Sequence, residues 1–317
     1  MKRLCIIAVT LAGLVAAVPS LAQGYPNRAI RMIVPFPPGG IVDINGRAVS
    51  KLMEDRLGVP VVIENRAGAG GLVGSVALAN ATPDGYTLGA LVPSTASRAF
   101  QKNPPIDIFT AFTPIGSIYI GPLAFSTNAQ TPAKTLKEFI DYAKANPGKL
   151  NFGTSSGPPA MAAAVLANLA GIKLETIEYK GAAPAMTALI ANEVQANFGA
   201  ISQFTPLMES GRVVPLAVAG DQRMPVIPNV PSMAELGFPG VKAYTVHAIM
   251  APTGVPSAVV ARLSPVIKDV VASPELEKLF RTSGKTLNVS NDELMRLIRE
   301  EVEFWLKAGQ IAGINPS

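Results

Sequence analysis

Short apolar segments alternate with helical patterns along this chain, and this alternation constrains the fold more than any other feature of the sequence. The first apolar segment, 29–34, leads into a turn of proline and glycine, after which Ile44, Ala48, Leu52 and Leu57 recur at the spacing of one helix face. Strand–helix–strand repetition of this kind predicts an α/β fold with a mainly parallel sheet and helices on both of its faces. The later segments with a strand pattern are 59–64, 86–92, 150–152, 174–179, 194–198, 213–219 and 245–251.

The alternating segments form two blocks, and the chain ends in further helical patterns at 257–271, 274–281 and 292–308. A return of the end of the chain to the first block needs two strands that cross between the blocks, and we place them near 119–126 and 244–251. We therefore predict two α/β lobes joined by two crossover strands, which is a hinge topology. The predicted first lobe comprises 23–122 and 248–317, and the predicted second lobe comprises 123–247.

The amino terminus has the pattern of a secretory signal peptide. Two basic residues precede an apolar run at 4–18, and small residues stand at positions 20 and 22. A membrane anchor is the alternative, but a span needs about 20 continuous apolar residues, whereas this run is shorter and ends at Pro19. We therefore predict a signal peptide at 1–22, cleavage after Ala22 and export to the periplasm.

The only cysteine, Cys5, lies inside the predicted signal peptide. The mature chain would therefore have no disulfide and no cysteine metal site. The formal net charge of +5 falls to about +3 when Lys2 and Arg3 are removed (5 − 2), no run of basic residues occurs, and aromatic residues make up only 6% of the chain. Nucleic-acid binding needs a clustered basic surface, so the sequence excludes that class of protein.

Few residues of the sequence fit a catalytic or cofactor site. His247 is the sole histidine, so no histidine cluster can hold a metal, and its apolar strand pattern favours a core or hinge role. The glycines of 68–71 form only part of a dinucleotide loop, because Val73 stands where the third glycine would be, and a tight strand–helix turn explains them. We therefore expect no cofactor and no metal. The alternative function is an enzyme for small acids, with Ser155 as nucleophile and Lys180 as its base.

Four strand-to-helix loops consist of small residues, and each would expose backbone N–H groups at the start of a helix. They are 37–40, 94–95, 153–157 and 181–184, two in each predicted lobe. A single loop of this kind is explained equally well as a good helix start. Together they predict an anion-binding cleft, because helix starts favour negative charge and ligands of open α/β sheets bind at the carboxyl ends of strands. We expect Gly40 to permit both a positive φ and close approach of the ligand. A purely structural or interaction protein would not need such a cleft.

The order and spacing of several motifs resemble the periplasmic receptors of the tripartite tricarboxylate transporter family, often called Bug-type solute-binding proteins. The resemblance extends through nearly the whole predicted mature chain. The motifs that carry it are 25–28 (YPNR), 34–40 (VPFPPGG) with Asp43 and Arg47, 64–71 (ENRAGAGG), 83–88 (PDGYTL), 146–153 (NPGKLNFG) and 179–181 (YKG).

This resemblance implies a type II periplasmic-binding fold, in which two α/β lobes close on a ligand. It implies a small carboxylate as the ligand (a di- or tricarboxylate, an acidic amino acid or an aromatic acid), held by loop backbone groups and ordered waters more than by a charged side chain. We expect a monomer that serves a membrane permease or a sensor. The residues that correspond to the family's ligand contacts are Phe36, Pro37, Pro38, Gly39, Gly40, Ser94, Thr95, Thr154, Ser155, Ser156, Gly181, Ala182, Ala183, Pro184, Gly199, Ala200 and Ser202.

Two segments depart from the family's pattern. Members often have an aromatic residue followed by Asp where this chain has Phe198-Gly199, and an aromatic residue in the return strand where this chain reads 246–249 (VHAI). We predict that Gly199 removes a negative charge from the cleft and leaves space there. The chain would then prefer carboxylates without an amine, including bulkier or aromatic ones, unless Glu178 or Asp221 supplies the missing charge.

Overall fold

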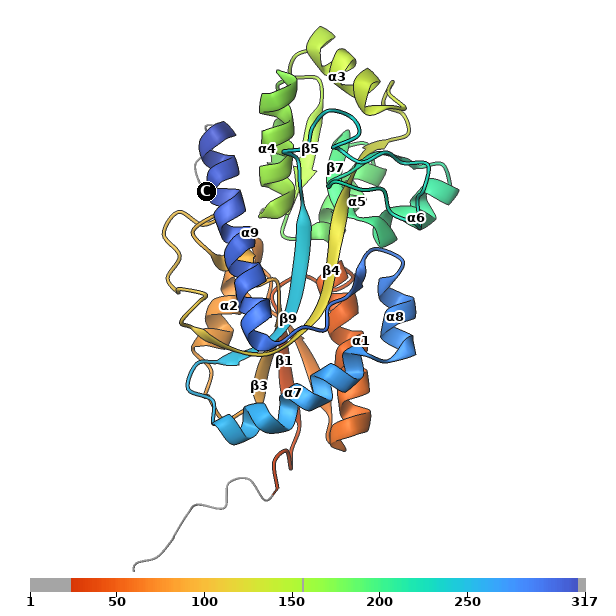
Figure 1. Ribbon diagram of the computed structural model, residues 1–317. Coiled ribbons are helices and arrows are strands. Elements are labelled where there is room, and N and C mark those ends of the chain that lie inside the picture. Colours follow the sequence, from red (N-terminus) through yellow and green to blue (C-terminus); the bar gives the residue numbers. More distant parts are fainter. Residues whose placement is uncertain (1–23, 156, 313–317) are drawn as a thin grey trace, which may run out of the picture.

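The computed structural model describes residues 24–155 and 157–312, so the predicted signal peptide and its cleavage site after Ala22 lie outside the described residues. Two α/β lobes lie one above the other and are connected by two long strands (Figure 1). No helix in this part of the chain combines the length and the apolar character that crossing a membrane requires.

The first lobe contains three parallel strands, β1, β2 and β3, and β1 lies between the other two. The side chains of Ile30, Met32, Ile33 and Val34 in β1 are fully buried, as expected for a parallel strand covered on both faces. The elements of this lobe are β1 (Ile30–Val34), α1 (Ile41–Leu57), β2 (Val61–Asn65), the 3-10 helix η1 (Ala69–Gly71), α2 (Leu72–Ala79), β3 (Thr87–Leu91) and the 3-10 helix η2 (Pro93–Ala96).

The second lobe repeats the arrangement, with β5 between β6 and β7 and all three strands parallel. Aromatic rings fill its core: the ring of Phe125 lies 5.1 Å from that of Phe139 and 5.0 Å from that of Phe198. The elements of this lobe are α3 (Leu136–Ala145), β5 (Asn151–Thr154), α4 (Pro158–Ala170), β6 (Glu175–Glu178), α5 (Ala182–Ile190), β7 (Ala196–Ala200), α6 (Ile201–Glu209) and β8 (Val213–Val218).

Two antiparallel strands, β4 (Phe112–Asn128) and β9 (Tyr244–Pro252), connect the lobes side by side (Figure 1). In the first lobe β9 pairs with β3, and in the second lobe β4 pairs with β7 and β8. The predicted crossover strands are therefore confirmed. The sheet is mixed rather than mainly parallel as we expected, because both connecting strands run antiparallel to their neighbours.

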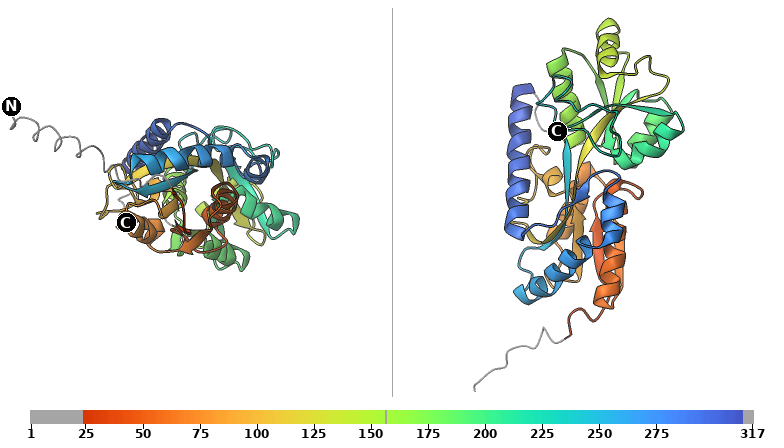
Figure 2. Two further views of the ribbon diagram at one scale, coloured as in Figure 1. Left: turned by 90° about the horizontal axis from the view of Figure 1, so that it is seen from below. Right: turned by 45° about the vertical axis from the view of Figure 1, so that its right-hand side comes forward.

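The end of the chain packs against both lobes. Its elements are α7 (Ser257–Val271), α8 (Pro274–Phe280), β10 (Lys285–Thr286), which pairs with β4, and α9 (Asn291–Ala312). Helix α9 lies on one side of the molecule, beside both lobes (Figure 2, right), and contacts α4 of the second lobe as well as η2 of the first. Its apolar stripe of Leu294, Ile298, Val302 and Trp305 is buried in a core that includes residues of both lobes. The exact lobe boundaries stay a prediction.

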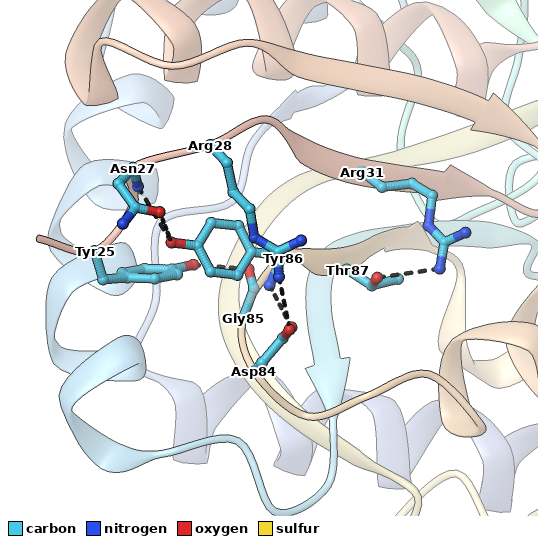
Figure 3. A network of polar contacts seen from close by, with 8 residues as sticks. All are labelled: Tyr25, Asn27, Arg28, Arg31, Asp84, Gly85, Tyr86 and Thr87. Atoms are coloured by element: carbon cyan, nitrogen blue, oxygen red, sulfur yellow. Dashed lines mark hydrogen bonds and ion pairs between the residues drawn. The ribbon is translucent and has the colours of Figure 1, made fainter. Parts of the chain in front are cut away.

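The motif YPNR (25–28) contacts the segment that leads into β3 through a network of polar interactions (Figure 3). The Tyr25 hydroxyl donates a hydrogen bond to the backbone oxygen of Gly85 at 2.7 Å. The Arg28 guanidinium pairs with Asp84 at 3.0 Å and lies 4.0 Å from the centre of the Tyr86 ring. Two of the motifs described above, YPNR and PDGYTL, are thus partners in one structural contact away from the cleft.

Candidate anion-binding site

A cavity of ≈ 60 Å³ lies between the two lobes, at the carboxyl ends of β1, β3, β5 and β7. This is the edge at which ligands of α/β sheets bind. Since one water needs about 10–15 Å³ of such volume, the cavity holds about four to six waters, or an organic acid of a few carbon atoms. Its lining consists of Phe36, Pro37, Gly40, Ile41, Val42, Gly70, Val92, Thr95, Leu123, Ser155, Pro159, Ala182, Phe198, Gly199, Ala200, Gln203 and Thr245.

Four α-helices begin at this cavity: α1 of the first lobe, and α4, α5 and α6 of the second. The first two residues of α4 are Pro158 and Pro159, which have no N–H group, so α1, α5 and α6 are the three starts that can supply N–H groups. The first N–H groups of a helix have no partner within the helix, and none of these three starts receives a side-chain cap from a residue that the structure describes. Side chains cap α3 (Thr135) and α8 (Ser273), whereas α2, α4 and α7 also lack such a cap, so it is the meeting of three uncapped starts at one cavity that distinguishes this place. The uncapped starts leave N–H groups from both lobes for an anion.

The lining of the cavity carries no charged side chain among the described residues. Its polar side chains are those of Thr95, Ser155, Gln203 and Thr245, and the Thr95 hydroxyl already donates to the Val92 backbone oxygen at 2.8 Å. An anion in this cavity would therefore be held by backbone N–H groups and neutral side chains.

The carboxylate of Asp43 stabilises the conformation of the loop 36–40, which precedes α1. It accepts hydrogen bonds from Gly39 N at 3.0 Å, Arg47 Nε at 3.0 Å and Asn65 Nδ2 at 2.8 Å, and Asn65 Nδ2 also donates to the Phe36 backbone oxygen at 2.9 Å. Burial acts to raise the pKa of Asp43, but these hydrogen bonds outweigh it and hold the pKa below its ordinary value. The family motif residues Asp43, Arg47 and Asn65 thus position the loop instead of lining the cavity.

The structure brings half of the predicted ligand contacts together. Two of the predicted contacts are buried away from the cavity. Ser94 is fully buried and its hydroxyl donates to Glu301 Oε1 of α9 at 2.9 Å, and Thr154 is buried and does not line the cavity. Ser156 lies outside the described residues. The predicted residues that line the cavity are Phe36, Pro37, Gly40, Thr95, Ser155, Ala182, Gly199 and Ala200. An adjoining groove is lined by Gly39, Ala183 and Ser202. Neither space is lined by Pro38, Gly181 or Pro184.

Sequence reasoning missed several lining residues. Ile41 and Val42 directly follow Gly40, so the expected helix start at this loop could have indicated them. Leu123 and Thr245 lie on the crossover strands, and Gln203 lies on α6, a helix that the sequence pattern did not predict.

The expectation of a positive φ at Gly40 is wrong. Gly40 has a φ of −77°, which any residue adopts, and the left-handed conformation belongs to Gly39, with a φ of 83°. A Cβ at Gly40 would meet only the Pro37 backbone oxygen, at 3.7 Å. A side chain at position 40 would therefore enter the cavity without straining the backbone.

The expectation that Gly199 leaves space is also wrong. A Cβ at position 199 would lie 2.9 Å from Cζ of Phe204 and 2.9 Å from Oδ1 of Asn197, so these side chains already fill the space. Gly199 brings no charge to the cavity, and the two carboxylates that could have supplied one instead, those of Asp221 and Glu178, do not line it. Asp221 pairs with Lys242 at 2.6 Å, and Glu178 lies on the exposed strand β6.

The two lobes contact each other beside the cavity. A Cβ at Gly181 of the second lobe would lie 2.5 Å from Cδ of Pro37 in the first lobe, and a Cβ at Gly157 would lie 3.3 Å from Cγ2 of Thr95. Real Cβ atoms are not found as close as the first of these distances. The absence of a side chain at Gly181 therefore allows the lobes to approach this closely.

His247 lies in the connecting strand β9 and is fully buried. Its Nδ1 lies 3.1 Å from Asn45 Nδ2, and its ring lies 4.7 Å from that of Tyr119 in β4. Burial lowers the pKa of His247 to about 3, so the ring is neutral at ordinary pH. The core or hinge position expected from the sequence is confirmed.

The alternative catalytic pair is not assembled at the cavity. Ser155 lines it, but Lys180 is exposed and does not. Within the described ranges no group of three or more His, Cys, Asp or Glu side chains is arranged to hold a metal ion.

Comparison with known proteins identifies relatives over almost the whole chain. A model of the tripartite tricarboxylate transporter family receptor matches residues 46–312. The protein BugT of Bordetella pertussis (strain Tohama I) is 32% identical over 310 residues, covering 96% of this chain and 95% of BugT.

Three solved structures have the same fold. The periplasmic binding protein BugD has a TM-score of 0.88 and 30% identity, covering 92% of this chain and 100% of BugD. R. palustris Rpa4515 with adipate has a TM-score of 0.88 and 26% identity, covering 92% of this chain and 100% of Rpa4515. MatC from Rhodopseudomonas palustris with bound malate has a TM-score of 0.84 and 27% identity, covering 90% of this chain and 99% of MatC.

Proposed function

This chain belongs to the tripartite tricarboxylate transporter receptor family of periplasmic solute-binding proteins, and we propose that it captures a small carboxylate in the cavity between its lobes. The observation that carries this proposal is the meeting of three uncapped helix starts, from both lobes, at a cavity whose described lining has no charged side chain. A carboxylate placed there accepts hydrogen bonds from N–H groups of α1 in one lobe and of α5 and α6 in the other. It therefore links the lobes in the closed arrangement.

The size and chemistry of the cavity favour short dicarboxylates. Its volume of ≈ 60 Å³ suits an acid of a few carbon atoms. Two relatives with the same fold were solved with adipate and with malate, which supports the same class of ligand for this chain. Apolar side chains of Phe36, Leu123 and Phe198 would contact the carbon chain of such an acid.

Capture and release would follow from hinge motion about β4 and β9, the strands that connect the lobes. We propose that the chain is exported with residues 1–22 as a cleaved signal peptide and acts as a monomer. A membrane permease or a sensor would receive the loaded form. The ligand would leave chemically unchanged, because no described titratable side chain lines the cavity to act as an acid or a base.

Carboxylates without an amine should bind more tightly than their amino acid counterparts. A buried ammonium group needs a partner, and no described side chain in the lining carries a negative charge. In calorimetric titrations we expect succinate to bind at least about tenfold more tightly than aspartate, and glutarate at least about tenfold more tightly than glutamate. Each difference corresponds to about 1.4 kcal/mol or more of binding free energy. Consistently tighter binding of the amino acids would contradict the proposed selectivity.

The same panel separates a receptor from an enzyme. After saturation with the tightest acid, the bound ligand is released by denaturation and identified by mass spectrometry. A receptor returns the acid intact and in stoichiometric amount. Conversion of the acid to a product would instead support the enzyme with Ser155 at the cavity.

A further inference from the structure

A groove of ≈ 400 Å³ between the lobes adjoins the anion cavity. Only Ile41 and Gln203 belong to the described linings of both the cavity and the groove. Ile41 is the first residue of α1 in the first lobe, and Gln203 lies in the first turn of α6 in the second lobe. The two side chains therefore stand at the boundary between the two spaces, one from each lobe.

The side-chain amide of Gln203 has an unused hydrogen-bonding group at this boundary. Its Oε1 is buried without a hydrogen-bond partner among the described residues, and so is the hydroxyl of the neighbouring Ser202, which lines the groove. Buried polar groups are normally paired, so a ligand or a water is expected to supply the partner. A carboxylate only accepts hydrogen bonds, so toward such a ligand the Gln203 amide turns by 180° and presents its NH₂ group in place of Oε1.

We infer that Gln203, together with Ile41, closes the anion cavity toward the groove and thereby sets the length of the carboxylate that the protein accepts. The inference rests on the proposed function and adds the substrate class: unbranched dicarboxylates short enough to end at Gln203. One carboxylate lies at the helix starts, and the Gln203 amide donates to the second. A longer chain meets the side chains of Gln203 and Ile41 before it reaches the groove.

The test is a series of dicarboxylates of increasing length, titrated calorimetrically against the full-length mature protein. The series is succinate, adipate, suberate and sebacate. For the unaltered protein we expect the affinity to fall steeply after adipate. In Gln203→Ala the cavity and the groove become one space, and the affinity for suberate should rise about tenfold relative to the unaltered protein.

Two further variants separate a length limit from a general loosening of the site. Gln203→Met keeps the length of the side chain but not its amide, so the limit should persist while the affinity for succinate falls about threefold to tenfold. Ile41→Ala opens the same boundary from the first lobe and should also admit suberate, which keeps the test valid if Gln203→Ala does not fold. Thr205→Ala, on the same helix but outside both described linings, should bind the series as the unaltered protein does.

The outcomes distinguish this inference from the proposed function. If the unaltered protein binds no dicarboxylate, the proposed function fails and the inference fails with it. If it binds short dicarboxylates, but both Gln203→Ala and Ile41→Ala keep the same dependence on length, only the inference is overturned. Tightest binding of sebacate by the unaltered protein would also overturn it.

Discussion

Replacing Gly181 with Ala should weaken carboxylate binding about tenfold to hundredfold, as an overpacking cost of about 1–3 kcal/mol implies. The added methyl group would lie 2.5 Å from Cδ of Pro37 in the opposite lobe, so the lobes could not approach as closely as they do here. Gly181 has a φ of 163°, an extended conformation that alanine also adopts, so its own loop should not be strained. The substitution therefore acts on closure and leaves each lobe intact.

Calorimetry would measure the loss of affinity, and small-angle scattering would measure the radius of gyration at saturating ligand. We expect the Gly181→Ala protein to stay more open than the unaltered protein when the ligand is bound. Gly240→Ala is a matched control, because its new methyl group would meet only Leu169 at 3.6 Å, an ordinary contact. Equal affinities in Gly181→Ala and Gly240→Ala would show that contact between the lobes at Pro37 has no part in binding.

Replacing Glu301 with Gln should remove a large pH dependence from the stability of the fold. Burial raises the pKa of Glu301 from its ordinary value of 4.5 to about 7, although the hydrogen bonds from Ser94 and Trp305 oppose the rise. An acid with a raised pKa in the folded state stabilises the fold fully below pH 4.5, and this contribution is lost as the pH rises through about 7. The difference between the two pKa values corresponds to about 3 kcal/mol in the free energy of unfolding.

Urea unfolding at a series of pH values from 4.5 to 8 tests this expectation. Over this range the free energy of unfolding should fall by about 3 kcal/mol more in the unaltered protein than in Glu301→Gln. Glu300→Gln is the control, because Glu300 is exposed and pairs with Arg296 on the surface, where ion pairs contribute little. Parallel pH profiles for the unaltered protein and Glu301→Gln would contradict the assignment of this pH dependence to Glu301.

Periodicity predicted most elements of the fold, and it failed where proline and glycine interrupt a pattern. The crossover strand near 119–126 was expected, but β4 begins at Phe112, and Pro114 and Gly116 flank an irregularity in its pairing with β9. Helix α6 was missed because it follows β7 with no turn between them and contains Pro206. The antiparallel direction of β4 and β9 depends on tertiary pairing, which a strand pattern does not contain.

The loops of the site could be predicted from the sequence, whereas the direction of individual side chains could not. The loops 37–40, 153–157 and 181–184 do precede helices at one cavity, because glycine and proline mark locally where a strand ends and a helix begins. Ser94 turns away because Glu301, 207 residues later in the chain, docks against it. Phe204 fills the space beside Gly199 because an unexpected helix positions it there. Both outcomes depend on contacts between distant segments.

A crystal structure of the protein with its tightest dicarboxylate tests the central claim most directly. We predict one ligand between the lobes, with a carboxylate accepting hydrogen bonds from the N–H groups of the first turns of α1, α5 and α6, and with no charged side chain in contact with it. Density for the ligand outside this cavity would contradict the account. Such a site is offered by the surface groove lined by Arg98, Asp107, Arg299 and Glu303. A carboxylate bound between the lobes by an arginine or lysine side chain would contradict it equally.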